Sequence, residues 1–171
     1  MTGIHEESST VTIAGRKSEI LVFAAAGLRF GLYSPIVKEL ARSVLITPLS
    51  GAPAVVEGIV NVRGAVVPVF DLRARFRFPP KPVELSDRLV IFRAGERTAA
   101  FRADSVEGLA ELEPGKVEDA KKVTTSSGYV AGIAKLADGL VLIHDPETFL
   151  ATAESEALDA ALSADGRGKS K

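Results

Sequence analysis

The chain of 171 residues has no cysteine, no tryptophan, a single methionine and two histidines. Without cysteine it can form neither disulfides nor thiolate metal sites. A metal site would have to rely on carboxylates, and the acidic residues between positions 107 and 119 lack the spacing of a calcium loop or a zinc site. We therefore expect no metal and no cofactor.

An excess of either charge is also missing, since 21 lysines and arginines stand against 22 aspartates and glutamates. A net charge of −1 gives no electrostatic reason to expect nucleic acid or an anionic membrane as a partner. No apolar run is long enough to cross a bilayer. Residues 1–16 are polar, whereas a secretory signal would be basic and then apolar. These absences favour a cytoplasmic protein that does not insert into a membrane.

What the sequence does contain is a series of short β-rich runs separated by glycine and proline turns. The runs cover residues 20–25, 28–32, 44–47, 58–62, 65–70, 88–93, 97–102, 106–112, 130–136 and 140–143. Many short strands with hardly any helical period between them predict an all-β fold of closed barrels. In the run 65–70 apolar residues are nearly continuous, so both faces should be buried. Pro68 cannot donate to a ladder, so this strand lies at an edge or its missing N–H points away from a neighbour.

The ends of the chain differ in composition from the middle. Residues 1–16 are interpreted as a flexible tail and residues 17–150 as the folded domain. The proline-rich stretch within residues 77–86 is the predicted seam between two lobes. Pro146 suits the first turn of a helix, and a weak amphipathic helix is expected within 153–162. Residues 163–171 should be disordered.

No group of residues forms a convincing catalytic constellation. His5 falls in the tail, and His144 ends a predicted strand, where capping or loop bonding is favoured over a role as general base or phospho-acceptor. No serine stands in a G-x-S-x-G elbow, and the segment 58–64 lacks the Lys-Ser or Lys-Thr pair of a phosphate-binding loop. Arginines alternate with phenylalanines in 73–78. They could stack single-stranded bases, or form an edge strand or loop with charges outside and phenylalanines inside.

The stretch 48–76, PLSGAPAVVEGIVNVRGAVVPVFDLRARF, is the most informative. Gly64 with Asn61 indicates a turn that needs positive φ or a close backbone approach, where the Asn61 side chain can satisfy backbone groups. Arg63 follows apolar positions, so its stem should be packed and its guanidinium should meet a particular acceptor. Asp71 is expected to accept hydrogen bonds from backbone N–H groups at the strand end.

This stretch resembles the signature of the CheW-like domain, the family of chemotaxis coupling proteins. Residues 57–64 resemble its G-x-x-N-L-R-G element, with Val62 in place of leucine, and residues 66–73 resemble the following V-P-x-x-D-L-R strand with Pro68 and Asp71. The resemblance covers about residues 17–150. It implies two SH3-like five-stranded β-barrel lobes that share a core, followed by a short C-terminal helix.

The resemblance also implies a function. Such proteins are adaptors that couple the signalling tip of methyl-accepting chemoreceptors to the regulatory domain of a CheA-type histidine kinase, and they are recruited to membrane receptor arrays from the cytoplasm. The family's partner contacts fall on Val37, Glu39, Gly58, Arg63 and Leu109. Glu39, on the strand before the motif, is expected to pair with Arg63.

Alternatives stay open at this point. Val37 and Leu109 could be core residues, and Gly58 simply a turn. Ala41 stands where the family usually has arginine, with Arg42 after it, so the side chain that faces the partner is undecided. The mixed charges of 117–123 would suit a particular kinase. A coupling protein of a pathway for surface motility, biofilm or development would look the same. A β-barrel that binds single-stranded nucleic acid through residues 73–78 is more remote, and an enzyme comes last.

Overall fold

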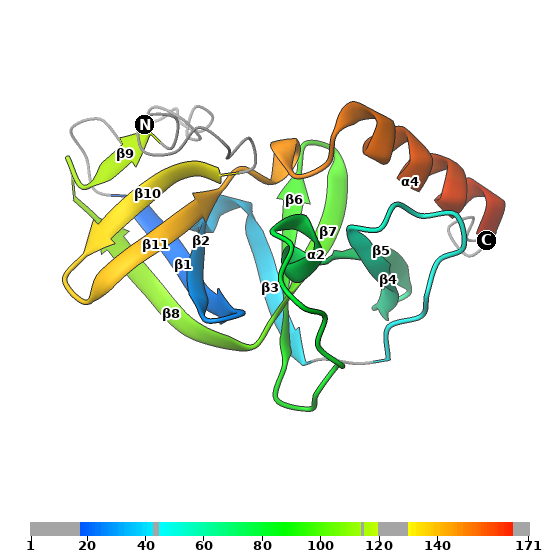
Figure 1. The fold of residues 1–171 in the computed structure, drawn as a ribbon, viewed down its shortest axis with the longest axis horizontal. Coiled ribbons are helices and arrows are strands. Elements are labelled where there is room, and N and C mark those ends of the chain that lie inside the picture. Colours follow the sequence, from blue (N-terminus) through cyan, green and yellow to red (C-terminus); the bar gives the residue numbers. More distant parts are fainter. Residues whose placement is uncertain (1–17, 43–44, 114, 120–129, 166–171) are drawn as a thin grey trace.

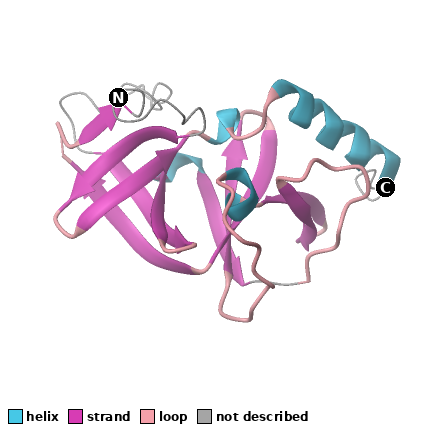
Figure 2. Cartoon of the chain, in the orientation of Figure 1, coloured by secondary structure: helices cyan, strands magenta, loops and turns pink. Residues whose placement is uncertain are grey.

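A computed structural model describes residues 18–42, 45–113, 115–119 and 130–165 (Figure 1). The predicted tail 1–16, position 44, residues 120–123 and the end of the chain from 166 lie outside the described residues. Strands dominate the described part, with one long helix near the C-terminus (Figure 2). No helix among the described residues is long and apolar enough to span a membrane.

The strands form two sheets. The six-stranded sheet has the order β8-β1-β2-β11-β10-β9 and the five-stranded sheet has the order β3-β6-β7-β5-β4. The first contains β1 (Ser18–Ala25), β2 (Leu28–Tyr33), β8 (Ser105–Leu112), β9 (Val117–Asp119), β10 (Val130–Leu136) and β11 (Gly139–His144). The second contains β3 (Val37–Arg42), β4 (Val56–Val62), β5 (Ala65–Phe70), β6 (Arg88–Ala94) and β7 (Arg97–Ala103). The all-β fold with two lobes is as predicted, and the short β9 makes one sheet six-stranded.

Three apolar clusters explain why the sheets behave as two lobes with a common core. One face of the six-stranded sheet encloses a small cluster that includes Ile20, Val22 and Ile143. One face of the five-stranded sheet encloses a second that includes Val69 and Ile91. The opposite faces of both sheets meet in the largest cluster, so each sheet is buried on both sides over much of its area. This arrangement confirms the shared core.

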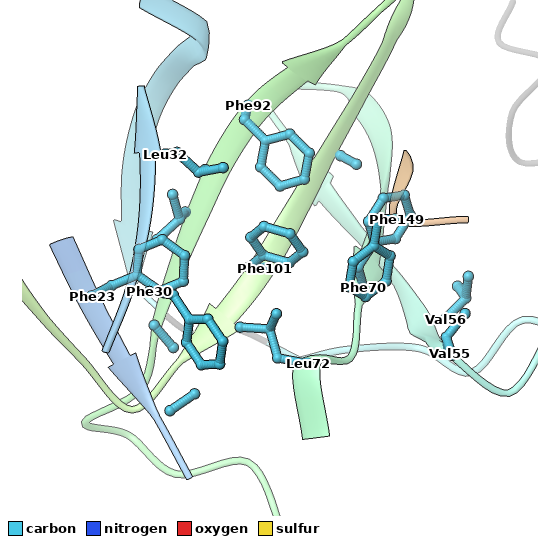
Figure 3. Packing of buried hydrophobic residues seen from close by; sticks show 14 of the residues in the cluster. Phe23, Phe30, Leu32, Val55, Val56, Phe70, Leu72, Phe92, Phe101 and Phe149 are labelled. Atoms are coloured by element: carbon cyan, nitrogen blue, oxygen red, sulfur yellow. The ribbon is translucent and has the colours of Figure 1, made fainter. Parts of the chain in front are cut away.

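Aromatic rings make the contact between the lobes. Phe23 of β1 lies 5.9 Å, between ring centroids, from Phe101 of β7, and Phe101 lies 4.6 Å from Phe92 of β6. Figure 3 shows Phe101 between the phenylalanines of the six-stranded sheet and the stacked pair Phe70–Phe149. Each ring buries a large apolar surface and the tilted pairs add a further favourable contact. The lobes are therefore one packing unit.

The chain changes sheet twice. It enters the five-stranded sheet through the 3-10 turn η1 (Ser34–Ile36) and returns at Asp104, between β7 and β8. The seam predicted near residues 77–86 instead falls in the connection from β5 to β6, two strands of the same sheet. That connection is held by Arg102 of β7, whose guanidinium donates to the carbonyls of Lys81 and Pro82 and to Asp87 Oδ2 at 2.8 Å.

Pro68 does not lie on an edge strand, because β5 is between β7 and β4. The second of the two predicted possibilities holds. Ile59, the partner of Pro68 on β4, exchanges both of its backbone hydrogen bonds with Thr47 on its other side. The pair Ile59–Pro68 is thus a non-hydrogen-bonded pair, and the ladder to β7 begins only at Val69. No backbone hydrogen bond from position 68 to β4 is therefore needed, and proline is tolerated there.

One predicted strand is wrong. In the run 44–47 only Thr47 pairs, as an isolated bridge to Ile59, and the strand lies earlier, as β3. Toward the C-terminus Pro146 begins the 3-10 turn η2 (Pro146–Thr148), as expected. The helix α4 (Thr152–Asp165) is longer than predicted, so positions 163–165 are helical. It buries Leu158 and Ala161 against the shared core, which explains why the helix continues.

Candidate functional site

The predicted pair of Glu39 and Arg63 is present. Arg63 Nη1 donates to Glu39 Oε2 at 3.0 Å. Glu39 is on β3 and Arg63 is in the turn after β4, and these two strands are the opposite edges of the five-stranded sheet. A direct contact between the edges requires the sheet to curl round on itself. The ion pair therefore marks the line along which this lobe closes.

Arg63 itself differs from the expectation. Its side chain is 79% exposed, so the prediction of a packed stem is wrong. The reason is local: Arg63 and Gly64 form the two-residue turn between β4 and β5, with φ of 52° and 86°. Positive φ at both central residues is the type I′ geometry that matches the twist of a hairpin. Asn61 Oδ1 accepts a hydrogen bond from Gly64 N at 2.9 Å, the role predicted for it.

Gly58 is neither the start of β4 nor a turn. It is buried within the strand, at a register shift between Val56 and Gly58. The closing segment passes so near that a Cβ at position 58 would lie 2.4 Å from Thr47 O. Thr47 N and O bond to Ile59 at 2.9 and 2.8 Å. Gly58 thus permits the segment that follows β3 to pair with β4 and complete the barrel, and it offers no side chain to a partner.

The two remaining predicted contact residues have different surroundings. Val37 is partly buried and packs against the shared core, as the alternative interpretation allowed. Leu109 is 61% exposed on β8, so its interpretation as a core residue is wrong. It is opposite Leu21 of the shared core in the β1–β8 register, on an edge strand of the six-stranded sheet.

The structure adds Leu40, which sequence reasoning missed. Leu40 is 46% exposed on β3, an edge of the five-stranded sheet, and is opposite Val90 of the shared core. The alternation along β3 decides which side chains are outward: Lys38, Leu40 and Arg42 are exposed. That alternation was the available signal, and it places Arg42 on the exposed side. We call the exposed sides of β3 and β8 around Leu40 and Leu109 the docking face.

The arginine-rich stretch is not a free basic surface. Leu72–Arg75 form the short helix α2, capped by Asp71 Oδ1, which accepts from Ala74 N at 3.2 Å as predicted for this carboxylate. Arg73 donates to both oxygens of Asp104, and Arg75 donates to Glu154 at 2.6 Å. Their side chains are only 11% and 7% exposed, so the expectation of charges on the outside is wrong for these two arginines, whereas Arg77 is exposed as expected.

The charged groups that are buried also serve packing. Arg102 and Asp87 are nearly inaccessible and form an ion pair at 2.8 Å. Burial opposes ionisation of Asp87, but hydrogen bonds from Glu84 N, Lys81 and Arg102 outweigh it and lower its pKa. Burial raises the pKa of Glu57, against the attraction of Arg102. The connection before β6 is thus fastened to β7 and β4 by the side chains of Lys81, Asp87, Arg102 and Glu57.

The histidines and the acidic residues are the candidates for acid–base or metal-binding groups within the described ranges. His144 is buried among aromatic rings, 5.1 Å from the Phe30 centroid and 5.3 Å from that of Phe101. Its ring packs in the shared core, the predicted capping or loop bonding stays a prediction, and His5 lies outside the described residues. No three His, Asp or Glu side chains in the described part of the chain gather in a way that could hold a metal ion.

The region expected to meet a kinase is described only in part. Val117–Asp119 form β9, which pairs with β10 at the end of the six-stranded sheet. Lys135 of β10 donates to Glu118 at 2.6 Å. The lysines at 121 and 122 lie outside the described residues, so the mixed-charge surface is seen only through Glu118 and Asp119.

Known proteins share this architecture. The chain is 24% identical over 143 residues to the chemotaxis protein CheW of Klebsiella aerogenes, covering 82% of this chain and 86% of the relative. It is 32% identical over 96 residues to protein FrzA of Myxococcus xanthus, covering 56% of this chain and 60% of FrzA. The crystal structure of the scaffolding protein TtCheW from Thermoanaerobacter tengcongensis superposes with a TM-score of 0.73 at 29% identity, covering 80% of this chain and 94% of TtCheW. The CheW-like domain model matches residues 19–154, and the chain belongs to the CheW-like domain family.

Proposed function

We propose that this chain is an adaptor that couples chemoreceptors to a CheA-type histidine kinase and carries out no chemistry of its own. Family membership supports the scaffolding role, and relatives are named for chemotaxis or scaffolding. The observation that carries the proposal is the docking face. Leu40 and Leu109 are exposed on edge strands of the two lobes, each opposite a residue of the shared core.

An exposed edge strand offers unpaired backbone N–H and C=O groups with which another chain can pair. The positions of the two edge strands are fixed relative to each other, because the aromatic core behind them holds the two lobes together. A rigid, pre-formed surface loses little conformational entropy on binding. This suits a protein that must hold two partners in a set geometry, with each contact modest and the assembly strengthened by multivalency.

The pathway is proposed at two levels. The first is an array that controls swimming, recruited from the cytoplasm to membrane receptors. The second is the same adaptor in a pathway for surface motility, biofilm or development. One relative is named FrzA rather than CheW, and this similarity supports the second pathway as an alternative. The docking face is the same in both.

The test is reconstitution with a receptor signalling-tip fragment and the CheA-type kinase of the same organism. We expect the chain to bind both and to be required for receptor control of kinase autophosphorylation. Leu109→Glu should weaken receptor binding, because a charge replaces the apolar contact. Leu85→Glu is the matched control, since Leu85 is 92% exposed on a turn rather than an edge strand. Failure of the wild-type chain to bind either partner would remove the proposal.

A further inference from the structure

The helix α4 is attached to the five-stranded lobe by a small apolar contact. Of its 14 residues only Leu158 and Ala161 are buried. A groove of about 540 Å³ remains between α4, β5 and the hairpin of β6 and β7, and Leu162, which lines it, is only partly buried. A helix of this length is marginally stable without tertiary packing. α4 should therefore open at a lower free energy than the strands of the core.

Two ion pairs hold α4 against the lobe. Asp159 accepts a hydrogen bond from Arg97 Nη2 of β7 at 2.7 Å, and the side chain of Asp159 is 64% exposed. Glu154 accepts one from Arg75 Nη2 at 2.6 Å. Glu154 also accepts from the backbone N–H of Ala151 at 2.9 Å, which satisfies a donor at the start of the helix. Glu154 thus both fastens α4 and caps its first turn.

The chain just before α4 is firmly anchored. Phe149 is fully buried and its ring stacks on that of Phe70, with 4.9 Å between the centroids. The guanidinium of Arg75 lies over the Phe149 ring, 5.3 Å from its centroid. The helix proper begins where Ser155 N donates to Ala151 O at 2.9 Å. The pivot for an opening of α4 therefore lies between Phe149 and Ala151.

The short helix α2 connects α4 to the crossing between the lobes. Arg73 and Arg75 are two residues apart on α2, so their side chains project to different sides of it. Arg75 reaches Glu154 of α4. Arg73 donates to both carboxylate oxygens of Asp104, where the chain crosses from β7 to β8, and Asp104 also accepts from Ala26 N between β1 and β2. Figure 1 shows α2 between the two sheets, where a shift of α2 changes both sets of contacts.

We propose that α4 is a strap that opens and closes on the five-stranded lobe while both barrels stay folded, and that α2 couples its closure to the lobe crossing. When α4 opens, Arg75 loses the carboxylate of Glu154 although its own side chain is only 7% exposed. A buried cation that loses its carboxylate gains by moving toward water. Arg73 moves with α2 and its bonds to Asp104 weaken. The placement of the two lobes thereby depends on a helix that belongs to neither barrel.

Native-state hydrogen exchange of the whole chain tests the strap. In the wild type the amides of Leu158 and Ala161 should exchange roughly ten-fold faster or more, relative to their intrinsic rates, than those of the core strands β6 and β7. Equal protection of α4 and these strands would overturn the proposal, because α4 would then open only together with the whole fold.

Glu154→Ala tests the coupling. The variant removes the ion pair and the cap of the first turn, so the α4 amides should exchange roughly ten-fold faster than in the wild type. The amide of Ala26, which donates to Asp104, should exchange roughly three-fold faster or more, although it lies in the other lobe. Glu156→Ala is the matched control, because Glu156 is an exposed glutamate of the same helix, and it should leave both sets of amides unchanged. A wild-type rate at Ala26 in Glu154→Ala would overturn the proposal.

Two further variants decide the matter if Glu154→Ala does not fold. Asp159→Asn removes the charge of the more exposed ion pair and should speed the exchange of α4 and of Ala26 in the same direction, to a smaller extent. Asp104→Asn weakens the acceptor of Arg73. Because coupling between two sites is reciprocal, this variant should also speed the exchange of the α4 amides. Wild-type exchange throughout α4 in Asp104→Asn would contradict the coupling and overturn the proposal.

Discussion

Gly58 and Thr47 touch through their backbones. A Cβ at position 58 would lie 2.4 Å from Thr47 O, closer than any real side chain can approach a carbonyl oxygen. Because the bridge of Thr47 to Ile59 completes the five-stranded barrel, the absence of a side chain at Gly58 is a condition for closure.

Gly58→Ala should therefore weaken the closure of the five-stranded barrel at Thr47 and Ile59. The added methyl pushes Thr47 away and weakens its two hydrogen bonds to Ile59, with an expected loss of roughly 1–3 kcal/mol in the free energy of unfolding. Hydrogen exchange locates the effect: the amide protons of Thr47 and Ile59 should exchange faster. Gly27→Ala is the control, because it also has positive φ, at 80°, but no atom within 4 Å of the added Cβ. Wild-type protection of both amides in Gly58→Ala would contradict the closure argument.

The ion pair of Glu39 and Arg63, which joins the two edges of the same barrel, leads to a second prediction. Arg63 is mostly exposed, so reversal of either charge should change stability by less than about 1 kcal/mol. Receptor binding should fall in Glu39→Arg and in Arg63→Glu, and much of it should return when both changes are combined. The same exchange in Lys135 and Glu118, an exposed pair at 2.6 Å on the other lobe, should leave binding unchanged. Absence of rescue in a pull-down would show that the pair does not act as a unit.

The sequence predicts local features of this site well and long-range ones poorly. The turn at Arg63 and Gly64, the bond from Gly64 N to Asn61 and the cap at Asp71 arise from residues at most three positions apart. Closure of the barrel joins Thr47 to Ile59, next to a register shift in β4. No local sequence pattern predicts this pairing. The resemblance to a known family supplied Glu39 and Arg63, which are 24 positions apart.

Two errors have physical causes. In β3 the run Lys38 to Ala41 is made of good helix formers, and its alternation becomes visible only against a sheet. The arginines at 73 and 75 looked like exposed charges because their acidic partners are 31 and 79 positions away. Tertiary contacts decided both cases.

The link between the lobes predicts acid sensitivity. Asp104 joins β7 to β8, accepts hydrogen bonds from Arg73 at 2.8 and 3.0 Å, and accepts a third from Ala26 N. The hydrogen bond from Arg73 is the main reason that the pKa of Asp104 falls below the ordinary value of 3.8, while burial opposes the shift. A carboxylate with a lowered pKa stabilises the fold above its unfolded pKa, and the contribution is lost as the pH falls through the folded pKa.

Asp104→Asn should therefore be less stable than wild type near neutral pH and should lose less stability on acidification below 3.8. Urea denaturation at a series of pH values measures both quantities. Asp138→Asn serves as the control, because Asp138 also pairs with an arginine, Arg29, but its carboxylate is 73% exposed and solvent screens the pair, so this variant should keep the wild-type slope. Equal slopes for wild type and Asp104→Asn would show that the bond to Arg73 contributes no acid sensitivity.

The buried pair of Arg102 and Asp87 predicts the largest effect. The connection before β6 has little regular structure of its own, and it is fastened by this pair, by Lys81 and by the bond from Glu84 N to Asp87 Oδ2 at 2.9 Å. Arg102→Met keeps the length of the stem but leaves Asp87, 1% exposed, without its main buried cation. Removal of one partner from a buried ion pair costs about 3–5 kcal/mol, because the other charge remains desolvated.

Arg102→Met with Asp87→Leu should lose less stability than the sum of the single changes, since no uncompensated buried aspartate remains. Urea denaturation of the two single variants and the double variant completes the cycle. Hydrogen exchange at Glu84 N should rise in Arg102→Met before the core amides respond, because the connection detaches first. Additive losses, or a protected Glu84 amide in Arg102→Met, would mean that Arg102 stabilises β7 and does not fasten the connection.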